Sequence, residues 1–146
     1  MTKLDSLRSA NAALVKQPLV AVFVGGTSGI GEYTVKTLAR NHGTTGAGLR
    51  AYIIGRNADA AAKIIADCRQ LAPNGDFIFL QARDLALVED VNKCCKDLVE
   101  REMKSGDGAA RIDLLVLTQG SLLFGGREGT RLLKALEVAR ISTNAL

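Results

Sequence analysis

The chain has few of the residues that usually staple small domains or stack on nucleic acids. Its 146 residues include three cysteines, two prolines, one histidine and no tryptophan, and only 4% are aromatic. Three cysteines cannot supply the paired spacing of a structural zinc site or a disulfide framework. We therefore expect no metal site and a reducing, cytoplasmic location.

Long apolar runs and runs of like charge are also missing. The best apolar run, Leu19–Val24, is far shorter than the roughly 20 residues of a membrane-spanning helix, and no apolar stretch follows the N-terminus. The net charge is +4, but basic residues alternate with acidic ones, as in 93–97 and 100–102. A solvated mixed-charge surface explains this pattern. The sequence thus predicts neither a membrane nor a nucleic-acid partner.

Short apolar runs alternate with longer helical patterns along the chain. We expect strands at 19–24, 49–54, 77–80 and 112–117. We expect helices at about 4–17, 29–41, 57–72 and 87–103, and a last one around Leu132, Leu133, Leu136 and Val138. Strands that alternate with helices of this length pair in parallel through right-handed crossovers. The pattern therefore predicts an α/β fold with a doubly wound parallel sheet.

The helical spacing also predicts which side chains face inward. These are Leu4, Leu7, Asn11, Leu14 and Val15; Ile30, Thr34, Val35 and Leu38; Ala60, Ile64, Ile65 and Cys68; and Val88, Val91, Cys95, Leu98 and Val99. One of the adjacent Cys94 and Cys95 is expected in the core. His42 is interpreted as a cation at a helix C-terminus.

A glycine-rich turn separates the first strand from the helix that follows it. Glycines at 25, 29 and 31 give the spacing G-x-x-x-G-x-G, and Thr27 and Ser28 add hydroxyl groups. Such a turn lets backbone amides and the positive end of a helix approach a phosphate. The alternative is a turn with a purely structural role.

Two related phosphate-binding motifs are excluded by the neighbouring residues. A Walker loop needs Lys followed by Ser or Thr where Glu32 and Tyr33 stand. A G-x-G-x-x-G fingerprint beginning at Gly29 has Thr34 at its third glycine position.

The glycine spacing resembles that of the short-chain dehydrogenase/reductase family, and three later segments agree with it in order. They are Gly55-Arg56-Asn57, Asp84-Leu85 and the segment 113–120, and the resemblance covers 19–126. Details of these segments are similar to a divergent branch found among fungal secondary-metabolite reductases. The resemblance implies a Rossmann-like sheet, truncated here to about four strands, with an N-terminal helical extension (1–18), an NADP-binding domain (19–126) and an incomplete remainder (127–146).

The same resemblance implies cofactor contacts at Gly25, Thr27, Ser28, Gly29, Ile30, Gly31, Arg56, Asn57, Asp84, Leu85, Thr118, Gln119 and Gly120. Arg56 ends the second strand, and no acid follows until Asp59. A guanidinium binds a 2′-phosphate, whereas a carboxylate there would repel it. We therefore expect NADP(H) rather than NAD(H), with Asn57 assisting; the alternative for Arg56 is a solvated surface residue.

The chain departs from the family pattern in several places. Val24 and 117–119 replace a usual Thr and Asn-Asn-Ala. The family's Tyr-x-x-x-Lys pair is missing, because Thr37 follows Tyr33 at that spacing and Arg56 follows Tyr52.

Asn144 is a weak catalytic candidate, and a plain C-terminal polar residue is the alternative. The resemblance implies hydride transfer between a nicotinamide and a carbonyl or alcohol of a small metabolite, with no turnover expected of this chain alone. A non-catalytic dinucleotide-binding module and a structural domain that binds nothing are the alternatives. We also expect an apolar, exposed fourth strand at 114–117 to promote self-association.

Overall fold

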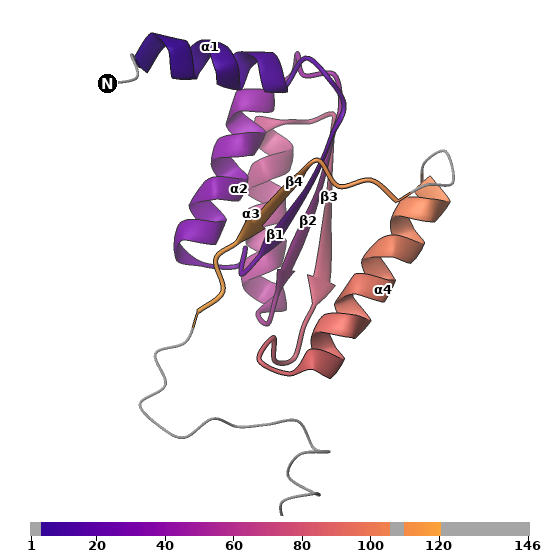
Figure 1. The fold of residues 1–146 in the computed structure, drawn as a ribbon. Helices are drawn as coiled ribbons and strands as arrows, with labels where there is room; N and C mark the ends of the chain where they lie inside the picture. The colour runs from indigo at the N-terminus through magenta and orange to yellow at the C-terminus, as the bar shows by residue number, and fades with distance from the viewer. Residues whose placement is uncertain (1–3, 106–109, 121–146) are drawn as a thin grey trace, which may run out of the picture.

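The computed structural model describes residues 4–105 and 110–120, which form alternating helices and strands (Figure 1). The elements are α1 (Leu4–Leu14), β1 (Leu19–Val24), α2 (Gly29–His42), β2 (Leu49–Gly55), α3 (Ala58–Leu71), β3 (Gly75–Gln81), α4 (Val88–Ser105) and β4 (Leu114–Leu117). The predicted alternation is confirmed, with differences of a few residues at the ends. The expected helix near Leu132, the boundary at 126 and Asn144 lie outside the described residues.

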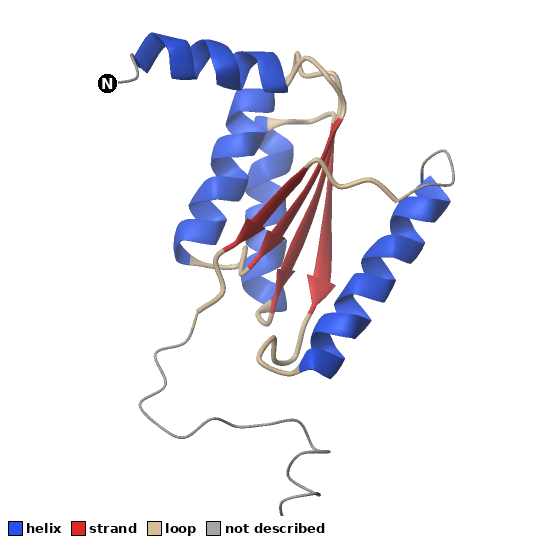
Figure 2. Ribbon diagram, viewed as in Figure 1, coloured by secondary structure: helices blue, strands red, loops and turns tan. Residues whose placement is uncertain are grey.

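The four strands form one parallel sheet in the order β3-β2-β1-β4. β1 pairs with β2 from Leu19↔Leu49 onward and with β4 from Ala21↔Leu114 onward. Helices α2 and α3 cover one face and α4 covers the other (Figure 2). The predicted doubly wound α/β fold is therefore confirmed.

Each face of the sheet has its own apolar core, because successive side chains of a strand point to opposite faces. On β1, Ala21 and Phe23 pack toward α2 and α3, whereas Val20 and Val22 pack toward α4. Both sets are buried. The continuous apolar run of β1 is what a strand covered on both faces requires.

Three of the predicted helix faces were wrong in part. On α2 the buried stripe is Gly31, Val35, Ala39 and His42, and Ile30 is 77% exposed. On α4 the buried residues are Cys94, Leu98 and Glu102, so the inward placement of Val88, Val91, Cys95 and Val99 is corrected. No residue of α1 is buried. The spacing of apolar side chains on a helix is compatible with more than one buried face. Which face is buried depends on how the helix packs against the sheet. The inward face expected on α3 is confirmed at Ile64 and Cys68.

His42 lies in the last turn of α2 as expected, but it is buried and does not act as a cation there. Its side chain is 1% exposed, Nδ1 donates to the Gly43 carbonyl at 3.2 Å, and Nε2 accepts from the Gly48 amide at 3.2 Å. A ring that both donates and accepts is a neutral imidazole. The loop between α2 and β2 closes around this ring, and a Cβ on Gly46 would overlap with it.

The cysteines differ in burial, which leads to a prediction about their reactivity. Cys68 and Cys94 are buried and Cys95 is exposed, as expected for one member of the adjacent pair. Burial raises the pKa of Cys68 from 9.0 to about 11. We therefore expect iodoacetamide at about pH 8 to label Cys95 first, because the thiolate is the reacting species.

The same shift in pKa predicts a loss of stability at high pH. Between 9.0 and about 11 the unfolded chain releases the Cys68 proton that the folded chain keeps, so stability falls as the pH rises. Peptide mass spectrometry measures the order in which the cysteines are labelled, and denaturation at high pH measures the loss of stability. Labelling of Cys68 as fast as that of Cys95 in the folded chain would contradict the buried placement.

β4 lies at one edge of the sheet within the described residues. Its start is fixed to β1, because the Val20 amide donates to Asp113 Oδ2 at 2.8 Å and the Asp113 amide donates to the Val20 carbonyl at 2.9 Å. The expected exposure of this strand is found, with Leu115 at 56% and Leu117 at 61%. Self-association through it stays a prediction.

No helix in 4–105 or 110–120 combines the length and the apolar character needed to cross a bilayer.

Candidate functional site: the glycine turn and the carboxyl edge of the sheet

The glycine turn lies where β1 ends and α2 begins, beside the end of β4 (Figure 1). In the order β3-β2-β1-β4 the chain crosses from one side of β1 to the other, so this position is the switch point of the sheet. Ligands of open parallel sheets bind outside the carboxyl ends of the strands at such a point. The sequence motif and the topology therefore indicate the same location.

The glycines of the turn are required by its geometry. Gly25 has a φ of +85°, and a Cβ there would lie 2.7 Å from the Gln119 nitrogen. A Cβ on Gly31 would overlap with the Gly25 carbonyl. Gly29, with a φ of +53°, has open space on the side where a Cβ would stand. The turn is thus closely packed against α2 and β4 but open at Gly29.

The backbone amides of the turn divide into two groups. Those of Gly25 and Gly26 donate to the Ile54 carbonyl, at 2.9 and 3.3 Å, which ties the turn to β2. Ser28 is the N-cap of α2, but its exposed side chain makes no capping hydrogen bond. The first-turn amides of a helix have no partner within the helix. The amides of 29–31 are therefore available to a bound anion.

The Thr118 hydroxyl is hydrogen-bonded to the backbone of the turn and is not free to donate to a ligand. Its Oγ1 donates to the carbonyls of Val24 and Gly25, at 3.1 and 3.3 Å, and its amide donates to Val24 at 2.9 Å. The hydroxyl thus braces the glycine turn from β4. Gln119 and Gly120 follow at the exposed end of the described segment.

Arg56 stands at the end of β2 with an exposed side chain, and its guanidinium has no hydrogen-bond or ion-pair partner among residues 4–105 and 110–120. Asn57 Oδ1 accepts the Ala60 amide at 3.0 Å and so caps α3. Thr27 lies against Gly55, where a Cβ would be 2.6 Å from Thr27 Cγ2. The structure brings the glycine turn and the end of β2 together.

The segment after β3 contributes Asp84 and Leu85. Asp84 Oδ1 accepts the Ala86 amide at 2.9 Å, and its own amide donates to Asp90 Oδ2 at 2.7 Å. Leu85 is partly buried against the core beneath α4. Arg83 is exposed just before them. Neither Arg83 nor Gln81 was singled out from the sequence, although each is a polar residue close to the end of a predicted strand.

Tyr33 and Lys36, on the helix that follows the turn, do not form an acid–base pair. Lys36 Nζ lies 2.7 Å from Glu32 Oε1 and 2.8 Å from Asp67 Oδ2, which links α2 to α3. Hydrogen bonds to these two carboxylates raise the pKa of Lys36. Tyr33 is 76% exposed. Lys36 is thus engaged by two carboxylates and is not paired with Tyr33.

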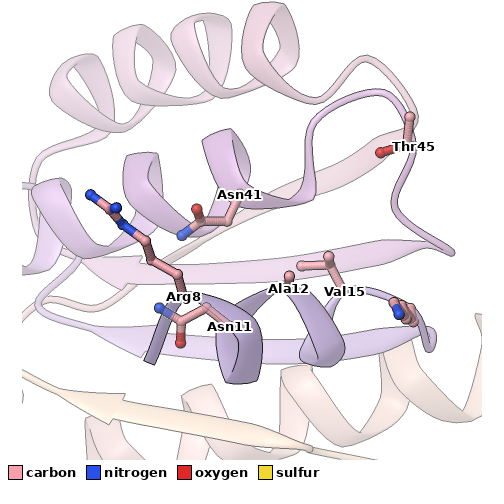
Figure 3. Close-up of a pocket in the computed structure, with 7 residues that line it drawn as sticks. Arg8, Asn11, Ala12, Val15, Asn41 and Thr45 are labelled. Atoms are coloured by element: carbon pink, nitrogen blue, oxygen red, sulfur yellow. The ribbon is translucent and has the colours of Figure 1, made fainter. Parts of the chain in front are cut away.

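A hollow of about 440 Å³ lies near the amino-terminal ends of the strands, between α1 and the end of α2 (Figure 3). Its lining includes Arg8, Asn11, Val15 and Asn41. Because α2 runs from the carboxyl edge of the sheet to its amino edge, this hollow is far from the glycine turn. It does not belong to the same site.

Comparison with known proteins finds fungal relatives that match most of this chain. The chain is 38% identical over 134 residues to the short-chain dehydrogenase/reductase SAT2 of Stachybotrys chartarum, covering 89% of this chain and 38% of the relative. It is 36% identical over 131 residues to oxidoreductase AN1596 of Emericella nidulans, covering 89% and 36%. The chain belongs to the short-chain dehydrogenase/reductase family. It spans less than two-fifths of the length of these two relatives.

The fold comparison agrees. The solved structure of the MalC reductase/Diels–Alderase from Malbranchea aurantiaca matches with a TM-score of 0.58 at 21% identity, over 80% of this chain and 42% of that one. No family model matches the chain. The sequence-based resemblance to the family, including its similarity to a fungal branch, is confirmed by the curated fungal relatives.

Members of the family are oxidoreductases that generally bind a nicotinamide dinucleotide. The glycine turn fits such a group, because it leaves helix amides uncapped and keeps the space beside Gly29 open. The amides of 29–31 would hold the diphosphate, and the ends of β2 and β3 would face the adenosine. The roles of all thirteen residues as cofactor contacts stay predictions: Gly25, Thr27, Ser28, Gly29, Ile30, Gly31, Arg56, Asn57, Asp84, Leu85, Thr118, Gln119 and Gly120.

Proposed function

We propose that this chain forms the NADP(H)-binding part of an oxidoreductase that moves hydride between the nicotinamide and a carbonyl or alcohol carbon of a small metabolite. The single observation that carries the proposal is the glycine turn at the switch point, with its uncapped helix amides. Its family membership and its fungal relatives support an oxidoreductase, and we place the substrate among secondary metabolites and the protein in the cytoplasm.

The preference for NADP(H) rests on the charges at the end of β2. Arg56 is exposed and unpaired in the described part of the chain, and the next acid, Asp59, lies in the first turn of α3. A carboxylate in the first turn stabilises its own helix. No acid lies in the sequence between the end of β2 and Asp59. No carboxylate of this segment therefore competes with a 2′-phosphate for the Arg56 guanidinium.

Within this chain the residues bind and orient rather than transfer protons. The turn holds the diphosphate by amides, Thr118 keeps the turn in place, and the bound cofactor supplies hydride. Neither tyrosine is placed to protonate a carbonyl oxygen, since Tyr33 lies on α2 and Tyr52 is buried with Glu102. A dinucleotide-binding module without turnover is the second candidate, and this placement of the tyrosines favours it.

Replacing Arg56 with alanine tests the cofactor preference. We expect the affinity for NADPH to fall by about tenfold or more, since a hydrogen bond to a charged group contributes roughly 1.5–3 kcal/mol. The affinity for NADH should stay unchanged. Calorimetric titration of both cofactors gives the ratio.

Arg83→Ala is the matched control, because it removes an exposed guanidinium just beyond the neighbouring strand. It should change the ratio much less than Arg56→Ala does. An unchanged ratio after Arg56→Ala, or equal affinities in the unaltered chain, would contradict the NADP(H) preference. Failure to bind either cofactor would contradict the proposed function as a whole.

A further inference from the structure

A side chain of β3 reaches the backbone that carries Arg56. Gln81 is the last residue of β3 and pairs in register with Gly55, the last residue of β2. Its Nε2 donates to the Arg56 carbonyl oxygen at 3.3 Å, and the Ala82 amide donates to the Gly55 carbonyl at 2.9 Å. The turn after β2 is therefore held from the neighbouring strand.

Nothing within the described residues fixes the guanidinium of Arg56 itself. Its position is set by the backbone from which the long side chain extends. On one side Thr27 packs against Gly55, and on the other Asn57 caps α3. The side-chain amide of Gln81 donates to the carbonyl of Arg56, which lies in the chain between Gly55 and Asn57. Binding groups that are held in place before the ligand arrives lose less entropy on binding.

We propose that Gln81 is a positioning residue for recognition of the 2′-phosphate, acting through the backbone of Arg56 and not by contact with the ligand. The inference rests on the proposed NADP(H) binding. Because Gln81 is exposed, loss of its hydrogen bond leaves the core intact. A purely structural role would change the affinity for all adenine nucleotides together, whereas positioning changes only the preference for the phosphate.

Gln81→Met tests this, because methionine keeps the length of the side chain and removes its donor. The probes are 2′,5′-ADP and 5′-AMP, which differ by the 2′-phosphate and need only the adenosine part of the site. We expect Gln81→Met to lower the preference for 2′,5′-ADP by about three- to tenfold, the range of one hydrogen bond. The affinity for 5′-AMP and the melting temperature should stay the same.

Two comparisons make the result specific. Gln70→Met, at an exposed position of α3, is the matched control and should change nothing. In an Arg56→Ala background, Gln81→Met should have no further effect on the preference, because its effect passes through Arg56. An equal loss for both nucleotides, or an additional loss in the Arg56→Ala background, would overturn the inference.

A measurement without ligand separates this inference from the proposed function. The ¹³C′ chemical shift of Arg56 reports the hydrogen bond at its carbonyl and should move in Gln81→Met but not in Gln70→Met. An unmoved shift would overturn the positioning role, whatever nucleotide the protein binds. If the shift moves and the unaltered chain shows no preference for 2′,5′-ADP, the NADP(H) proposal fails and the link from Gln81 to specificity fails with it. Arg56→Ala lowering the preference while Gln81→Met leaves it intact would overturn the inference alone.

Discussion

Replacing Gly31 with alanine is expected to remove dinucleotide binding and to lower the free energy of unfolding by about 1–3 kcal/mol, the usual cost of overpacking. A Cβ at this position would overlap with the Gly25 carbonyl and lie 2.6 Å from Thr118 Oγ1. To accommodate it, α2 must move away from the turn. The amides of 29–31 would then no longer converge on one diphosphate.

Thr37→Ala is the control for this substitution, because Thr37 is exposed on the same helix. Denaturation in urea gives the change in stability, and titration with NADPH and NADH gives binding. Binding of NADPH and binding of NADH should be lost together, whereas Arg56→Ala should weaken only the binding of NADPH. Normal affinity in a folded Gly31→Ala protein would contradict the placement of the diphosphate at this turn.

A second large effect is expected at Glu102, a carboxylate buried far from the glycine turn. Its side chain is 4% exposed and accepts from the Tyr52 hydroxyl at 2.7 Å and from Arg50 Nη1 at 3.1 Å. Burial and this hydrogen bond raise the pKa of Tyr52, which therefore stays a donor. Glu102→Ala leaves the Tyr52 hydroxyl unpaired and should destabilise the protein by about 3 kcal/mol.

The comparison for Glu102 uses two variants. Glu102→Gln keeps an acceptor for Tyr52 but loses the charge facing Arg50, so we expect a smaller loss of stability. Glu100→Ala, exposed on the same helix, should have little effect. Equal melting temperatures for Glu102→Ala and Glu100→Ala would show that the hydrogen bonds of Glu102 with Tyr52 and Arg50 do not hold α4 to β2. Affinity for NADPH should be unaffected wherever the variant is folded.

Much of the fold follows from local pattern. The apolar run Leu19–Val24 is typical of a strand covered on both faces, and helices of about 14 residues between strands require parallel pairing. The glycine turn was also predictable, since spacing, strand and helix all lie within one short segment. These features depend on residues close together in the chain.

Other features depend on residues that are distant in sequence. Thr118 braces a turn 93 residues away, and Gln81 reaches a carbonyl 25 residues away. The inward face of α4 was predicted correctly at Leu98 but not at its other positions, because a buried Glu102 satisfied by Tyr52 looks polar in the sequence.

The sequence by itself determined the alternation of elements and the glycine turn, because backbone propensity and short-range spacing carry that information. The tertiary structure alone decided that His42 is buried and neutral, that Thr118 serves the turn, and that Gln81 supports Arg56. A polar side chain has the same local pattern whether it faces solvent or a distant carbonyl. Its partner becomes known only when the strands are placed side by side.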